Sequence, residues 1–427
     1  MKVLIVGGGG REHAIALKIK ENPEVTALYA APGNGGIAQI ATCLPFKATD
    51  VDGIVRWAAE NKVDFVIVAP DDPLCLGMVD ALAEQGIPAF GPRKNAAIIE
   101  GSKVFSKNLM KKYGIPTAAY ETFDDYDAAV KYLQTADMPI VVKADGLALG
   151  KGVLICPDRE NAVEAVASMM KEAKFGASGA RVVIEEFLPG PEVSVLAFTD
   201  GKTVKPMVAS MDHKRALDHD EGLNTGGMGT IAPNPCYTPE LAQRCMDEIF
   251  LPTIAAMNAE GRTFTGCLYF GLMMTPKGPK VIEYNCRFGD PETQVVLPLL
   301  KSDLLTIMRA TVDGTLADTP VEFASGAACC IVLASGGYPV SYKSGYPISG
   351  LDEAGKTATV FHAGTKLVDG QIVTAGGRVL GVTAAADTLE AAIDKAYQAA
   401  DKITFTDMHM RRDIGQRALA SRKESHS

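Results

Sequence analysis

Short apolar runs alternate with helical stretches over the first hundred positions of the chain. Strands are expected at residues 2–6, 26–30 and 65–69 and around 89–90, with helices between them. Strands that alternate with helices are typical of a parallel sheet covered by helices. Residues 1–101 are therefore predicted to form an N-terminal parallel α/β domain.

The pattern changes at a helix that is predicted to begin at Gly101-Ser102-Lys103 and to end near Tyr113. A compact unit follows, with a helix from about Glu160 and strands expected at 139–143, 153–156 and 181–186. Beyond residue 191 the chain is rich in strands, which are expected at 192–198, 204–210, 266–274 and 280–285. Residues 102–324 are therefore predicted to form a second, larger domain.

A third pattern begins near Ala324 and predicts a small α+β C-terminal domain over residues 325–427. Its polar tail from Ser421 is expected to fray. The fold class predicted for the whole chain is α/β and α+β multidomain. The elements expected in the last part are strands at 328–334, 357–362, 371–374 and 379–384 and a helix at 388–402.

Composition and charge argue against several classes of protein. A chain of 427 residues with 47% apolar residues is expected to fold into several domains. The net charge of −9, without any basic stretch, argues against nucleic-acid binding. The nine cysteines include no C-x-x-C pair, which is typical of reduced thiols. Residues 1–6 are too short for a signal peptide, and no apolar run approaches the roughly 20 residues that span a bilayer. We expect a cytoplasmic protein without membrane contact.

The segment at residues 281–294 carries the strongest chemical signal. Alternation along the expected strand puts Glu283 and Asn285 on one face, and a carboxylate beside an amide oxygen suits a hard divalent cation such as Mg²⁺. Arg287, two residues further on, could meet phosphate oxygens. The alternative is a strand end at which Glu283 pairs with a nearby lysine or arginine.

A glycine-rich loop follows Lys143 and contains Gly146, Gly150 and Gly152. Backbone N–H groups of such loops can approach phosphates closely, and a lysine at the strand end would assist them. The spacing is not that of a Walker A loop, and no helix follows. An ordinary hairpin turn is the alternative.

Three further segments have the residue types of a ligand site. Residues 184–192 link two strand regions and could bind adenine through their backbone and ribose through Glu192, or could be a plain linker. The glycines at 226–229 would weaken any regular element without a functional reason. His213, in the charged segment before them, could be a general base or a packed histidine.

The loops that follow the N-terminal strands are expected to bind a phosphate-bearing ligand. Residues 7–13 lack the third glycine of a dinucleotide fingerprint, and no acidic residue ends the second strand. A mononucleotide-like phosphate at the helix N-terminus fits better. The matching loops lie at residues 31–35 and 69–73.

With these motifs assembled, the chain resembles the phosphoribosylamine–glycine ligase (glycinamide ribonucleotide synthetase) family of the ATP-grasp superfamily. The resemblance is colinear over residues 1–417, and the runs at 224–229 and 285–294 are specific to the family. It also rests on the motifs at 6–13, 31–35, 100–103, 143–152, 185–192, 212–215, 376–380 and 412–415.

The resemblance implies an N-terminal substrate domain, an ATP-grasp domain with an inserted lid at about 121–187, and a C-terminal domain. It assigns Mg²⁺ or Mn²⁺ to Glu283 and Asn285, and catalysis to Lys214, Arg287 and Asp290. The residues implied for ATP are Lys103, Lys143, Gly150, Gly152, Glu185, Glu186, Leu188 and Glu192. Those implied for the substrates are Gly9, Gly10, Arg11, Gly33, Asn34, Asp71, Asp212, Asn224, Thr225, Gly226 and Gly227.

Three positions depart from the family pattern. Asp71 stands where the family has glutamate, which shortens the side chain by one methylene group. Met211 and Leu223 stand where glutamine and proline are expected. The first difference affects the expected reach toward phosphoribosylamine.

The activity implied by the resemblance is ATP-dependent ligation of glycine to 5-phospho-β-D-ribosylamine through glycyl phosphate, in purine biosynthesis. The expected partners are glycine, phosphoribosylamine and ATP, and a monomer or weak dimer is expected. The alternatives are another ATP-grasp carboxylate-amine ligase, a purine-pathway carboxylase, and an ATP sensor without catalysis. The sensor is disfavoured because the chain retains all of the following residues: Lys103, Lys143, Glu283, Asn285 and Arg287.

Overall fold

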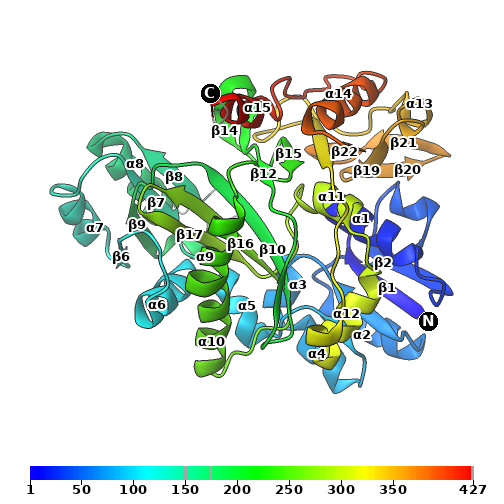
Figure 1. The fold of residues 1–427 in the computed structure, drawn as a ribbon, viewed down its shortest axis with the longest axis horizontal. Coiled ribbons are helices and arrows are strands. Elements are labelled where there is room, and N and C mark those ends of the chain that lie inside the picture. The colour runs from blue at the N-terminus through cyan, green and yellow to red at the C-terminus, as the bar shows by residue number, and fades with distance from the viewer. Residues whose placement is uncertain (148–151, 173–175, 425–427) are drawn as a thin grey trace.

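The computed structural model describes residues 1–147, 152–172 and 176–424. Figure 1 shows a blue N-terminal part, a green central sheet, a teal unit that projects to one side, and an orange-red C-terminal part above the N-terminal one. The predicted class of a multidomain protein with parallel and antiparallel sheets is confirmed. Within the described residues, none of the helices combines the length and the apolar character needed to cross a membrane.

The N-terminal part is a five-stranded parallel sheet in the order β3-β2-β1-β4-β5. Because β1 lies between β2 and β4, the strand order reverses at β1, which is where open α/β sheets bind ligands at their carboxyl ends. The strands are β1 (Lys2–Gly7), β2 (Ala27–Pro32), β3 (Thr42–Cys43), β4 (Phe65–Val68) and β5 (Ala89–Phe90). The helices are α1 (Gly10–Lys20), α2 (Val51–Glu60), α3 (Asp71–Cys75), α4 (Met78–Glu84) and α5 (Lys94–Gly101).

The teal unit is an antiparallel sheet in the order β6-β9-β7-β8, with its own apolar core. Alternate residues of the strands, such as Val142 and Ile184, pack with residues of the helices, such as Val166. The strands are β6 (Tyr120–Phe123), β7 (Ile140–Ala144), β8 (Val153–Cys156) and β9 (Val182–Glu186). The helices are α7 (Tyr126–Leu133) and α8 (Arg159–Met170).

The central sheet is antiparallel in the order β11-β10-β16-β17, and it carries the expected metal face. Glu283 lies opposite Gly271 and Asn285 opposite Tyr269, so both project from one face. A register shift lies between these pairs and the rest of the ladder. The elements are α6 (Lys103–Tyr113), β10 (Glu192–Thr199), β11 (Val204–Pro206), α9 (Pro239–Cys245), α10 (Leu251–Ala259), β16 (Gly266–Thr275) and β17 (Gly278–Asn285).

The C-terminal sheet takes its first two strands from the middle of the chain. Its order is β12-β15-β18-β22-β19, formed by β12 (Met211–Asp212), β15 (Gly229–Ala232), β18 (Ala327–Ala334), β22 (Arg378–Ala386) and β19 (Thr359–His362). Between β12 and β15 the chain forms a hairpin of β13 (Arg215–Leu217) and β14 (Glu221–Asn224). These four short strands were not predicted. The sequence from residue 211 to 232 therefore joins the central and C-terminal parts.

The end of the chain differs from expectation. Helix α15 (Gln416–Glu424) includes Ser421, so the prediction of a frayed tail from that residue is wrong as far as Glu424. The remaining elements are α11 (Thr293–Val296), α12 (Leu304–Asp313), α13 (Leu351–Gly355), β20 (Thr365–Val368), β21 (Gln371–Thr374) and α14 (Leu389–Ala400).

A buried pair of histidines joins the N-terminal and C-terminal parts. The backbone N–H of His362 in β19 donates to Nδ1 of His13 in α1 at 2.8 Å, and the ring of His13 meets that of Phe361 edge-on. Burial lowers the pKa of His13 to about 3 and that of His362 to about 4. Both rings are therefore neutral at pH 7.

We predict that acid weakens this contact. The unfolded chain binds protons at these histidines near pH 6.5, whereas the folded protein does so only near pH 3 to 4. Stability should therefore fall as the pH is lowered from about 6.5, by up to about 1.4 kcal/mol per pH unit for each histidine. Thermal denaturation of His13→Gln should show a shallower loss with acid than the unchanged protein. The control is His219→Asn, which changes an exposed histidine. If the stability of His13→Gln fell with acid as steeply as that of the unchanged protein, the result would contradict this account.

Candidate active site

The loops at the carboxyl ends of β1 and β2 are held together by tight backbone contacts. A Cβ on Gly8 would lie 2.4 Å from the carbonyl oxygen of Gly33, so only glycine fits there. Asn34 donates through Nδ2 to the carbonyls of Gly8 at 2.9 Å and of His362 at 2.8 Å. The loops after β1 and β2 are thereby fixed to each other and to the C-terminal sheet. Gly9, Gly10, Gly33 and Asn34 thus lie together, as predicted.

Asp290 faces these loops from the segment after β17. Its carboxylate accepts from the backbone N–H of Arg11 at 3.3 Å and from Nε2 of Gln294 at 2.7 Å. Burial alone would raise the pKa of Asp290, but the charges of Arg378 and Arg11 outweigh it and lower the pKa. Asp290 is therefore an ionised carboxylate at the N-terminus of α1, where the helix dipole also favours negative charge.

Arg287 connects the end of β17 with residues of the N-terminal part. Its Nη2 donates to Oε1 of Glu100 at 2.9 Å and to Oδ1 of Asn285 at 3.1 Å. Burial would raise the pKa of Asp71, but the neighbouring Arg287 and Arg11 lower it, so the shorter aspartate still senses both arginines. The Nε of Arg287 is buried and has no hydrogen-bond partner among the described residues. An unpaired buried donor here is available to an anionic ligand.

Glu283 lies beside Asn285 with a cationic neighbour. Nζ of Lys214 is 3.6 Å from Oε1 of Glu283 and 3.5 Å from Oε2 of Glu192. Burial would raise the pKa of Glu283, but Lys214, Lys143 and further cations lower it. A Cβ on Gly271, across the strand pair, would come within 2.9 Å of the Glu283 side chain. The glycine therefore leaves room for this carboxylate.

Two buried lysines share the carboxylate of Glu185, which lies in β9 of the teal unit. Lys143 forms an ion pair with Oε1 of Glu185, and Lys107 lies 2.5 Å from Oε2 of the same side chain. Lys143 also donates to the carbonyl of Ile282 at 3.1 Å, and Lys107 donates to Oγ1 of Thr117 at 2.7 Å. The side chain of Glu185 is thus a counter-charge to two lysines, which the sequence did not predict.

The other residues expected at the nucleotide lie around these lysines. Nζ of Lys103 donates to the carbonyl of Gly146 at 2.8 Å, and Gly152 accepts through its carbonyl from Ala144 at 2.8 Å. Glu186 accepts from the backbone N–H of Ala119 at 3.0 Å and pairs with Lys280. Leu188 is half-buried and Glu192 is exposed. Gly150 lies outside the described residues.

The loop between β14 and β15 forms a further part of the candidate site. Thr225 donates through Oγ1 to the carbonyl of Lys214 at 2.8 Å, and Gly227 donates to Oγ1 of Thr225 at 3.0 Å. Arg378 donates through Nη1 to the carbonyls of Gly226 and Asp290, each at 2.8 Å. A Cβ on Gly226 would lie 2.8 Å from Cζ of Arg378. The glycine allows this close approach.

Asp212 and His213 lie next to this loop and have different surroundings. Burial and the nearby carboxylate of Glu292 raise the pKa of Asp212 well above its usual value, although Lys214 and Arg378 oppose this. His213 has both ring nitrogens engaged, since Nδ1 lies 3.1 Å from the carbonyl of Gly229 and Nε2 accepts from the N–H of Gly415 at 3.2 Å. The general-base interpretation of His213 is therefore wrong, and the packed-histidine alternative holds.

Three residues of the site escaped sequence reasoning as individual candidates: Lys107, Glu100 and Arg378. Lys107 lies one helical turn after Lys103 in α6, which was an available signal. Glu100 stands next to the predicted phosphate-binding motif and meets Arg287 from 187 positions away. Arg378 follows a glycine pair that the sequence singled out without a role. Each acts on a partner far away in sequence, which a local pattern does not reveal.

The arrangement fits a divalent cation that is shared with phosphate. No cluster of three or more His, Cys, Asp or Glu side chains suitable for a metal occurs in the described part of the chain. Mg²⁺ in nucleotide sites needs only one or two protein ligands, since phosphates and water supply the rest. Glu283 and Asn285, with four cationic side chains nearby, have this character.

The chain was compared with known protein families. It matches the phosphoribosylglycinamide synthetase N domain over residues 1–100, the ATP-grasp (A) domain over 101–293 and the C domain over 328–417. A phosphoribosylamine–glycine ligase of Halalkalibacterium halodurans is 48% identical over 425 residues, covering 100% of this chain and 99% of that protein. One of Caldanaerobacter subterraneus subsp. tengcongensis is 48% identical over 414 residues, covering 97% and 99%.

Solved structures support the same grouping. The crystal structure of phosphoribosylamine–glycine ligase from Thermotoga maritima is 34% identical, with a TM-score of 0.86 over 97% of this chain and 100% of that chain. The biotin carboxylase domain of a Hydrogenobacter thermophilus 2-oxoglutarate carboxylase is 18% identical, with a TM-score of 0.72 over 96% of this chain and 91% of that chain, and shares the fold. This chain belongs to the phosphoribosylglycinamide synthetase family of ATP-grasp proteins.

Proposed function

We propose that this chain performs its family's ligation with the residues gathered around β17. The enzyme is an ATP-dependent phosphoribosylamine–glycine ligase of purine biosynthesis. The observation that carries the residue assignment is the cluster at the end of β17, where Glu283 has Lys214, Lys143 and Lys103 as cationic neighbours and Asn285 accepts from Arg287.

ATP would occupy the side of this cluster that is formed by the teal unit. Lys103 and Lys143 would neutralise its phosphates, and the strand end at Glu186 and Leu188 would bind adenine, with Glu192 at the ribose. Glu283 and Asn285 would hold Mg²⁺ or Mn²⁺, which would neutralise charge on the phosphates when bound. Lys143 must then exchange part of its pairing with Glu185 for a phosphate oxygen.

Phosphoribosylamine would bind at the loops of the N-terminal part. Its phosphate would lie near the N-terminus of α1 at Gly9 and Gly10, where it must displace the hydrogen bond from the Arg11 N–H to Asp290, and its ribose would lie near Asn34 and Asp71. Asp290 is an ionised carboxylate beside these loops and is placed to orient an amine.

Glycine would lie between the two substrates, near Arg287 and the loop at residues 224–227. Its carboxylate attacks the γ-phosphorus of ATP, ADP leaves, and the amine of phosphoribosylamine then displaces phosphate from glycyl phosphate. Lys214, which lies beside Glu283, and Arg287, which donates to Asn285, would stabilise the charge that develops in these steps. Such a reaction requires positioning and charge neutralisation without a protein nucleophile.

We further propose a cytoplasmic enzyme that works as a monomer or a weak dimer, with glycine, phosphoribosylamine and ATP as its ligands. The proposed activity can be tested by ADP release with both substrates, with each alone, and with neither. Rapid ADP formation only when glycine and phosphoribosylamine are both present supports the ligase. ADP formation that is indifferent to both would refute it.

We predict that Glu283→Gln lowers turnover at least about a hundredfold, because the loss of a major electrostatic group typically has this effect. The steady-state rate of ADP release with both substrates measures it. Glu353→Gln, which changes an exposed carboxylate far along the chain, should leave the rate unchanged. Near-normal turnover of Glu283→Gln would contradict the assignment of Glu283.

We also predict that Lys107→Met raises the KM for ATP about tenfold. Without Lys107, Glu185 would hold Lys143 more strongly, which leaves Lys143 less available to phosphate. Lys111→Met, an exposed change in the same helix, is the matched control.

This account also has a pH signature. Burial lowers the pKa of Lys107 to about 8, so Lys107 loses its proton above that pH. The KM for ATP of the unchanged enzyme should therefore rise above about pH 8, and that of Lys107→Met should not show this rise. Equal KM values in the two proteins at pH 7 would contradict the proposed role.

A further inference from the structure

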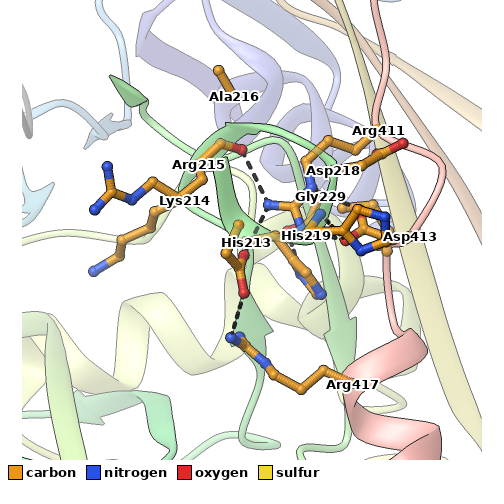
Figure 2. A network of polar contacts seen from close by, with 12 residues as sticks. His213, Lys214, Arg215, Ala216, Asp218, His219, Gly229, Arg411, Asp413 and Arg417 are labelled. Carbon is orange, nitrogen blue, oxygen red and sulfur yellow. Dashed lines mark hydrogen bonds and ion pairs between the residues drawn. The ribbon is translucent and has the colours of Figure 1, made fainter. Parts of the chain in front are cut away.

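The hairpin of β13 and β14 is held from outside by the last part of the chain. Residues 409–417 follow α14 in the sequence and contact the hairpin. They are here called the C-terminal clamp. Figure 2 shows Arg411, Asp413 and Arg417 of the clamp facing the hairpin from one side. The sequence singled out a motif at residues 412–415 without assigning it a function.

Arg411 is the centre of the clamp. It is 1% exposed, and its guanidinium group donates through Nε and Nη2 to the two carboxylate oxygens of Asp413, each at 2.8 Å. Its Nη1 donates to the carbonyl of Arg215 and to Oδ1 of Asp220, each at 3.1 Å. A buried guanidinium is costly unless it is paired in this way, and lysine cannot reproduce the fork.

Other clamp residues bind the same hairpin. Asp413 accepts from the backbone N–H of His219 at 2.9 Å, and Arg417 pairs with Asp220 at 2.8 Å. The ring of His409 lies 2.7 Å from the carbonyl of Ala216. His219 and Asp220 both have positive φ, so the hairpin tip adopts a conformation that non-glycine residues rarely take. The clamp provides the contacts that hold it.

Both ends of the hairpin enter the candidate active site. Lys214 precedes β13, and Thr225 follows β14 and bonds to the carbonyl of Lys214 through both its N–H and its hydroxyl group. The side chain of Lys214 is 36% exposed, and its Nζ lies no closer than 3.5 Å to the carboxylates of Glu192 and Glu283. The position of this ammonium group therefore depends on the backbone of Lys214 together with these two loose ion pairs.

We propose that Arg411 is a positioning residue for the ligase reaction. Through the hairpin it fixes the backbone of Lys214 and of the loop at residues 224–227 against the metal face of β17. The inference rests on one part of the proposed function, namely that Lys214 is a catalytic group. A purely structural Arg411 would stabilise the C-terminal part without any coupling to Lys214.

A double-mutant cycle separates these two roles. Turnover is measured for Arg411→Met, Lys214→Met and the double variant, with thermal denaturation of each. We expect a loss of about 30-fold for Arg411→Met and about 100-fold for Lys214→Met. We expect the double variant to lose no more than about threefold beyond Lys214→Met, because a displaced lysine has already lost its effect.

The matched control is Arg412→Met. Arg412 adjoins Arg411, but its side chain pairs with Asp401 at 2.6 Å and is 57% exposed, so turnover should stay within about twofold. Asp220→Asn, at a half-exposed position that meets both Arg411 and Arg417, serves as a milder variant if Arg411→Met does not fold. It should show the same non-additive pattern with Lys214→Met.

Two results would overturn the inference. Losses of Arg411→Met and Lys214→Met that multiply in the double variant would show that Arg411 does not act through Lys214. A folded Arg411→Met with full turnover would show that it does not position the site at all. Full activity of Lys214→Met would instead contradict the proposed catalytic role of Lys214, which distinguishes the failure of the two proposals.

Discussion

The pairing of buried charge is the constraint on which the rest of this structure depends. Three of the cations assigned to the phosphates and the substrate already pair with a carboxylate: Lys143 with Glu185, Arg287 with Glu100, and Lys214 with Glu283. Buried charges without partners would cost several kcal/mol each. The protein can therefore hold a cluster of cationic side chains although the net charge of the chain is −9. Bound phosphates would replace or share the carboxylates that already pair with these cations.

The same pairs connect parts of the chain that are distant in sequence. Glu100 ends the N-terminal part and joins Arg287 after β17, while Arg378 of β22 reaches the carbonyls of Gly226 and Asp290. The C-terminal clamp continues this pattern with Arg411 and the hairpin before Asn224. The candidate active site thus lies where the N-terminal, central and C-terminal parts meet, and each part contributes groups that contact the others.

The shared face of Glu283 and Asn285 and most regular elements could be predicted because their signals are local. Alternation alone placed Glu283 and Asn285 together, and the long apolar strands were found within a few residues of their ends. The strands β12 to β15 were missed, since two to four residues carry no periodicity; β15 pairs with the distant β18, and β13 and β14 pair only with each other. The partners Lys107 and Glu100 were missed for a related reason, because the carboxylate or guanidinium that each meets is remote in sequence.

The central claim is that this site activates the carboxylate of glycine by transferring phosphate to it. The most direct measurement uses glycine labelled with ¹⁸O in both carboxylate oxygens, together with ATP and phosphoribosylamine, and analyses the inorganic phosphate by mass spectrometry. The account predicts one ¹⁸O atom in each phosphate formed, because the oxygen that attacks phosphorus leaves with it. Phosphate without label, released at the rate of ligation, would contradict the account.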